Sequence, residues 1–107
     1  MATKAYVVLR YTGPTHSPKA LETWNEAGWK LFAEAWPEWQ KAGATHMRTT
    51  SDVLGNTPRT MQMIEFGTVE QALACFTLPF AMAMKDRFIA LGTLDLSITV
   101  HSLGREA

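Results

Sequence analysis

Six segments of regular structure follow one another in this chain, and their order limits the fold more than any other feature. Four segments are rich in β-branched, aromatic or alternating apolar residues, as strands are. They span residues 4–12, 45–52, 60–66 and 94–102. Two longer helical segments separate the first strand from the second and the third from the fourth. The order β-α-β-β-α-β predicts an α+β, ferredoxin-like fold with a four-stranded antiparallel sheet.

Local signals mark where the helices begin and where they are disturbed. Ser17 is an N-cap residue, and Thr68 with Gln71 forms a capping box. We expect Pro37 to bend or break the first helix and Pro79 to interrupt or restart the second. Residues 55–59, Gly-Asn-Thr-Pro-Arg, predict the turn of a hairpin. Both helices are expected to cover one face of the sheet.

The first strand is apolar on both sides. Tyr6 and Val8 point to one face of the sheet, and Val7, Leu9 and Tyr11 point to the other. One chain has only enough helix to cover a single face. We therefore expect a second copy to cover the other face, which predicts a homodimer formed through the sheet.

Composition excludes several classes of protein. A chain of 107 residues predicts a single domain over residues 1–107. Its net charge of zero gives no reason to expect nucleic acid or an anionic membrane as a partner. A single cysteine, Cys75, permits no internal disulfide and fits a cytoplasmic protein. The sequence has no metal-binding spacing and no phosphate or dinucleotide loop, so we predict neither metal nor cofactor.

The pattern resembles that of a known group. The opening strand AYVVLRYT, the passages IEFGTVEQALACF and LPFAMAMKDRF, and the closing strand LSITVHS are similar to those of the dimeric α/β-barrel superfamily. Its small members include EthD-like proteins, antibiotic-biosynthesis monooxygenases and stress-responsive barrel proteins. The resemblance covers residues 4–102 and implies a homodimer with a cavity between each sheet and its own helices. Superfamily activities range from cofactor-free oxidation of polyphenols to haem breakdown and polyketide cyclisation, and no member's catalytic residue set matches this chain.

All four tryptophans lie in the first helical segment, between residues 24 and 39. On a helical wheel Trp24, Trp29, Trp36 and Trp39 share one face about 160° wide, which is broader than one packing surface needs. Two interpretations follow: the rings fill the core and a dimer interface, or part of this face roofs a cavity for a flat apolar ligand. Asn25 falls inside the aromatic arc, where its amide would bond either to the sheet or to a ligand.

Three strand residues are candidates for proton transfer: His46, His101 and Glu65. The alternative for the histidines is an ordinary, partly buried position. If Glu65 is buried, it needs a cation, and Arg10 and Arg48 are the natural partners. The alternative is a general base whose pKa is raised in an apolar pocket.

Three further strand residues are candidates for contact with a ligand: Tyr6, Arg10 and Met63. Methionine fills irregular gaps, so Met63 belongs either to the core or to an adaptable pocket.

Three functions are compatible with the sequence. The first is a small cofactor-independent enzyme acting on an apolar aromatic or polyketide-like molecule. In it Trp24, Trp29 and Trp36 would shape the pocket, Asn25 would orient the substrate, and a histidine or the glutamate would move a proton. This requires at least one of the three proton-transfer candidates to point into a cavity next to Asn25. The second is a non-catalytic binding or stress-response dimer, and the third is a purely structural dimer.

Overall fold

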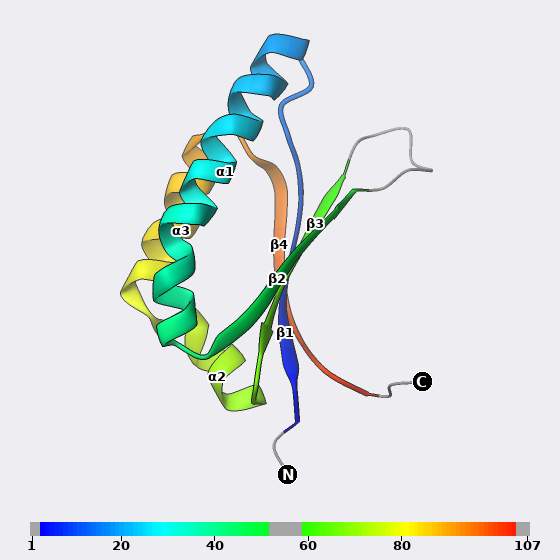
Figure 1. The fold of residues 1–107 in the computed structure, drawn as a ribbon. Coiled ribbons are helices and arrows are strands. Elements are labelled where there is room, and N and C mark those ends of the chain that lie inside the picture. Colours follow the sequence, from blue (N-terminus) through cyan, green and yellow to red (C-terminus); the bar gives the residue numbers. More distant parts are fainter. Residues whose placement is uncertain (1–2, 52–58, 105–107) are drawn as a thin grey trace.

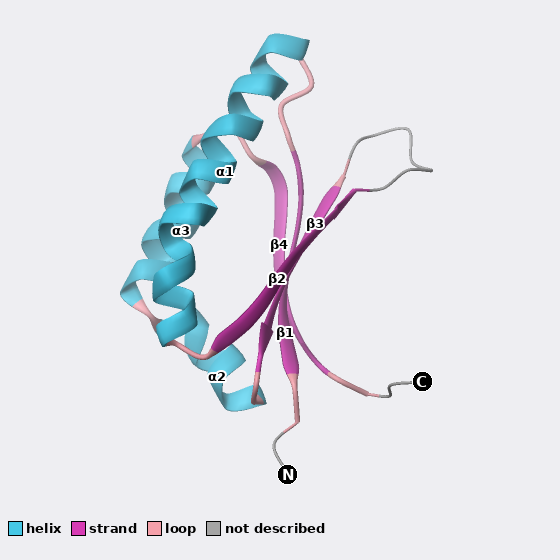
Figure 2. Ribbon diagram, viewed as in Figure 1, coloured by secondary structure: helices cyan, strands magenta, loops and turns pink. Residues whose placement is uncertain are grey.

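The computed structural model of the chain describes residues 3–51 and 59–104 and has the predicted order of elements (Figure 1). The four strands form one antiparallel sheet in the order β2-β3-β1-β4, and the helices lie together on one side of it (Figure 2). The predicted turn at 55–59 lies outside the described residues except for Arg59. The order of the elements and the sheet confirm the predicted ferredoxin-like α+β fold. The elements are β1 Ala5–Thr12, α1 Pro18–Lys41, β2 Ala44–Ser51, β3 Thr60–Phe66, α2 Val69–Ala74, the 3₁₀ turn η1 Cys75–Thr77, α3 Pro79–Ala90 and β4 Leu94–Ser102.

Helix α1 starts at the predicted cap and continues through Pro37. The hydroxyl of Ser17 accepts a hydrogen bond from the backbone N–H of Ala20 at 3.0 Å. Of the two effects expected of Pro37, a bend or a break, the break does not occur, because the helix continues through this residue. Proline removes one intrahelical hydrogen bond, but Ala35 and Trp39 on either side of it are buried in the core. Their packing holds the last turn of α1 against the rest of the protein.

The second helical segment is divided before Pro79, as predicted. The capping box forms: Thr68 Oγ1 accepts from the N–H of Gln71 at 3.1 Å, and Gln71 Oε1 accepts from the N–H of Thr68 at 3.2 Å. Helix α2 ends at Ala74, so its phase does not extend to Cys75, which is buried.

The alternation of β1 assigns the two faces of the sheet. Val7, Leu9 and Tyr11 point toward the helices and belong to the core. Tyr6 and Arg10, like Val8, point to the opposite side, which we name the outer face. Strand pairing extends this face across the sheet, because directly opposed residues share a side. The pairs on the outer face are Tyr6 with Glu65 and His101, Val8 with Met63 and Thr99, Arg10 with Met61 and Ser97, His46 with Glu65, and Arg48 with Met63.

Strand β4 departs from its alternating sequence at its beginning. The register against β1 shifts by one residue between the pairs of Arg10 with Ser97 and of Thr12 with Leu94. Asp95 has a φ of 52°, a left-handed conformation that accommodates the extra residue. Leu96 and Ile98 of β4 face the core, whereas Leu94, which precedes the shift, is exposed.

Aromatic rings from β1, α1 and α3 pack together at one end of the core. Tyr11 meets Trp24 and Phe88 edge-on, at centroid distances of 5.7 and 4.7 Å. Trp24 Nε1 donates to Thr93 Oγ1 at 2.9 Å, and Thr93 Oγ1 donates to the Phe88 carbonyl at 2.7 Å. All of these side chains are buried, so Thr93 supplies hydrogen-bond partners to two polar groups inside the protein.

Replacing Thr93 with valine should destabilise the fold. Thr93→Val keeps the shape of the side chain but leaves the Trp24 N–H buried without a partner. We expect the free energy of unfolding in urea to fall by about 1–3 kcal/mol. Thr77→Val is the control, since this exposed hydroxyl bonds the Ala74 carbonyl, which water can replace. Equal losses in the two variants would contradict the role given to Thr93.

Candidate functional site

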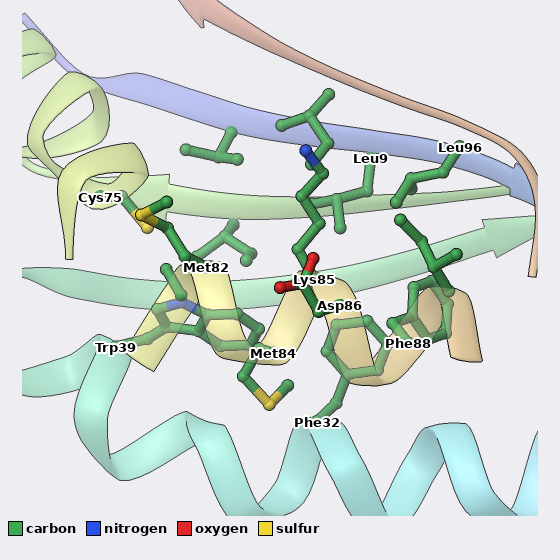
Figure 3. Close-up of a pocket in the computed structure, with 15 residues that line it drawn as sticks. Leu9, Phe32, Trp39, Cys75, Met82, Met84, Lys85, Asp86, Phe88 and Leu96 are labelled. Carbon is green, nitrogen blue, oxygen red and sulfur yellow. The ribbon is translucent and has the colours of Figure 1, made fainter. Parts of the chain in front are cut away.

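A cavity of about 480 Å³ lies between α3 and the sheet; we name it the α3 pocket (Figure 3). Its floor is the inner face of three strands, formed by Val7, Leu9, Ile64, Leu96 and Ile98. Helix α3 and the C-terminal half of α1 supply the other walls, chiefly Phe32, Trp39, Met82, Met84 and Phe88. Its volume lies within the range of small-molecule sites, roughly 300–1,000 Å³.

Few polar groups line the α3 pocket. Burial raises the pKa of the Cys75 thiol, and the nearby Trp39 N–H lowers it in part. The thiol is therefore protonated near neutral pH and is a poor nucleophile. Lys85 and Asp86 also line the pocket, but both are solvent-exposed. The interior is consequently suited to an apolar molecule.

The structure places the four tryptophans in different surroundings. Trp39, which was not among the predicted site residues, lines the α3 pocket. Trp24 is core, and Trp29 is 57% exposed. Both line a second, smaller cavity of about 150 Å³ together with Asn25. Trp36 is half-buried and lines neither cavity.

The smaller cavity has a more polar wall than the α3 pocket. Gln62 is almost completely buried there; its Oε1 accepts from the Tyr11 hydroxyl at 3.3 Å, and its Nε2 lies 2.9 Å from Met47 Sδ. Burial raises the pKa of Tyr11 to about 12, so the phenol stays neutral. These groups satisfy one another, and the cavity is too small for a polycyclic ligand.

Glu65 lies on the outer face at the centre of a hydrogen-bonded cluster. Its Oε2 accepts from the Thr45 hydroxyl at 2.8 Å and lies 3.0 Å from His46 Nδ1, while its Oε1 accepts from the Tyr6 hydroxyl at 3.1 Å. These bonds, that of Thr45 first, hold the pKa of Glu65 below its ordinary value despite partial desolvation. The direction is opposite to that required by a general base with a raised pKa. The partner of Glu65 is His46 rather than either predicted arginine.

Two other candidates on the outer face, Arg10 and His101, are linked through Thr99. His101 Nε2 lies 2.8 Å from Thr99 Oγ1, which also accepts from Arg10 Nη1 at 3.4 Å. Met63 is half-buried on the same face, between Val8 and Arg48.

None of the three proton-transfer candidates lines either cavity. His46, Glu65 and His101 all occupy the outer face, whereas Asn25 lies on the helical side of the sheet. The expectation that one of them points into a cavity next to Asn25 is therefore wrong for a single chain. Side chains alternate between the two faces along each strand, and Tyr6 points to the outer face. Glu65 and His101 are paired with Tyr6, so they point to the outer face as well.

Two further properties concern the described part of the chain. No group of three or more histidine, cysteine, aspartate or glutamate side chains within residues 3–51 and 59–104 could hold a metal ion. Within the same residues, no helix is long and apolar enough to cross a membrane.

Comparison with known proteins identifies the fold. No family model and no curated protein matches the sequence. Among solved structures, a variant of SnoaB, a cofactor-independent oxygenase from Streptomyces nogalater, has a TM-score of 0.70 at 11% identity, covering 99% of this chain and 97% of that one. A provisionally assigned antibiotic biosynthesis monooxygenase from Deinococcus radiodurans has a TM-score of 0.69 at 14% identity, covering 96% and 95%. A dimeric ferredoxin-like protein from an uncultured marine organism has a TM-score of 0.68 at 13% identity, covering both chains fully. This chain thus has the ferredoxin-like fold of these proteins.

Proposed function

We propose that this chain binds an apolar aromatic or polyketide-like small molecule in the α3 pocket. The observation that carries the proposal is the pocket itself: about 480 Å³ of space between α3 and the sheet, walled by aliphatic, aromatic and methionine side chains. An open apolar cavity of this size forfeits packing energy that a filled core would gain. A flat ligand of two or three fused rings would recover that energy.

Turnover without a cofactor is the finer form of this proposal. It is supported by the similarity of fold to SnoaB, which is described as a cofactor-independent oxygenase. Within the α3 pocket, the ionisable lining groups are the protonated Cys75 thiol and the exposed Lys85 and Asp86. Proton transfer by His46, His101 or Glu65 stays a prediction, and in a single chain these groups lie across the sheet from the ligand.

We also propose that the protein is a homodimer in which a second copy covers the outer face. Similar structures are described as dimeric, and the middle of this face holds Val8, which is buried, and Met63, which is half-buried. Helices cover only the inner face within one chain (Figure 1). The second copy would bring an identical apolar strip against this one.

Filling the α3 pocket should abolish binding. Ala81 lines the pocket, whereas Ala83, two residues along the same helix, is exposed and does not. In a titration with 9-fluorenone followed by tryptophan emission, wild type should show saturable quenching. Ala81→Phe should weaken binding by about tenfold or more, because the new ring occupies the ligand's space.

Ala83→Phe is the matched control and should bind as wild type does. Far-UV circular dichroism would show that both variants are folded. Unchanged affinity in Ala81→Phe would contradict the location of the site. No saturation by wild type with fluorenone, naphthols or anthrone would contradict the proposed function.

A charge on the outer face should separate the dimer. Met63→Lys places a cation beside Arg48 of the same chain, and two copies would bring these charges together. In sedimentation equilibrium at micromolar concentration, we expect wild type at the dimer mass and Met63→Lys at the monomer mass. A wild-type monomer would overturn the proposed assembly, and so would a Met63→Lys dimer as tight as wild type.

A further inference from the structure

The indole N–H of Trp39 is a buried donor without a strong acceptor. Trp39 is only 4% exposed, and among the described residues its Nε1 meets no acceptor other than the neighbouring Cys75 thiol, a weak one. Trp24, also buried, has its Nε1 bonded to Thr93. A buried donor without a good acceptor destabilises the protein, because the hydration that its N–H loses is not replaced. An unpaired donor of this kind calls for an explanation, and an absent ligand is one.

The unpaired donor lies in the wall of the α3 pocket. Figure 3 shows the Trp39 nitrogen on the edge of the ring that faces Cys75 and Met82. The ring packs between Phe32 and Phe80, at centroid distances of 5.8 and 6.3 Å, which fixes its orientation. The nearby Cys75 thiol is protonated because burial raises its pKa, and sulfur is a weak acceptor. The N–H therefore remains available to a molecule in the pocket.

The pocket interior offers this donor no better partner. Apart from Cys75, Lys85 and Asp86, its lining side chains are all apolar, and Lys85 and Asp86 are solvent-exposed. The acceptor must come from the ligand. We infer that the α3 pocket selects an apolar ring system bearing a carbonyl group that accepts a hydrogen bond from Trp39 Nε1. This inference rests on the proposed function and names the ligand class more narrowly.

A carbonyl suits this site better than a hydroxyl or a carboxylate. A hydroxyl oxygen can accept from the indole, but its own O–H would then need an acceptor that the apolar wall does not provide. A carboxylate would lose its hydration on entering, and Lys85, the cation that lines the pocket, is itself solvent-exposed. A ketone oxygen only accepts, so a single N–H satisfies it without leaving a polar group unpaired.

Three matched ligands test the inference on the intact protein. Fluorene, 9-fluorenol and 9-fluorenone share one ring system and carry CH₂, CHOH and C=O at the same position. We expect isothermal titration to show fluorenone binding about tenfold more tightly than fluorene, with fluorenol between them. In spectra of protein labelled with ¹⁵N-tryptophan, fluorenone should shift the Trp39 indole proton downfield and fluorene should not.

Trp39→Phe keeps an aromatic ring and removes the donor. In this variant the preference for fluorenone over fluorene should disappear, whereas Trp29→Phe, at an exposed position, should retain it. The ligand series on wild type alone decides the question if Trp39→Phe fails to fold. Equal affinities for the three ligands with an unmoved Trp39 signal would overturn the inference while leaving the pocket in place. Absence of binding by all three would overturn the proposed function together with it.

Discussion

The packing of α1 and α3 against the inner face of the sheet is the contact on which the rest of the structure depends. Strand β1 is central in that packing, because its odd-numbered side chains from Ala5 to Tyr11 meet the helices. The same alternation sends Tyr6 and Arg10 to the other side. One short strand thus divides the molecule into an apolar region under the helices and a mixed surface behind the sheet. The proposed ligand site and the proposed assembly surface are separated by the thickness of a single sheet.

The α3 pocket shows how a small core can remain incompletely filled. At one end, Tyr11, Trp24, Phe32 and Phe88 pack ring against ring. Toward the other end, flexible methionines and aliphatic strand residues surround open space. Polar groups in the well-packed end are paired, as Trp24 is with Thr93. The Trp39 N–H, which meets only the weak acceptor Cys75, is found where space remains, and the proposed ligand recognition depends on this coincidence.

The order of elements and their caps were predictable because each depends on local chemistry. Ser17, Thr68 with Gln71, and the restart at Pro79 act within a few residues of chain. The site was harder to predict, since it depends on tertiary packing. Because Pro37 was able to break the helix, the sequence alone did not fix the direction of the Trp39 side chain. Helix α1 is continuous in the structure, and Trp39 consequently lines the pocket. The period of two along β3 places Glu65 and Met63 on one side of the strand, but only the pairing with β1 identifies that side as the outer face.

Methionines on both sides of the sheet provide the most direct test of where the ligand binds. Met82 and Met84 line the α3 pocket, and Met61 and Met63 lie on the outer face. The measurement is a ¹H–¹³C spectrum of protein labelled at the methionine methyl groups, recorded during titration with 9-fluorenone. The structure predicts shifts of the Met82 and Met84 methyl signals with a common saturation curve, while Met61 and Met63 stay unchanged. Shifts confined to Met61 and Met63 would place the ligand behind the sheet and contradict the account.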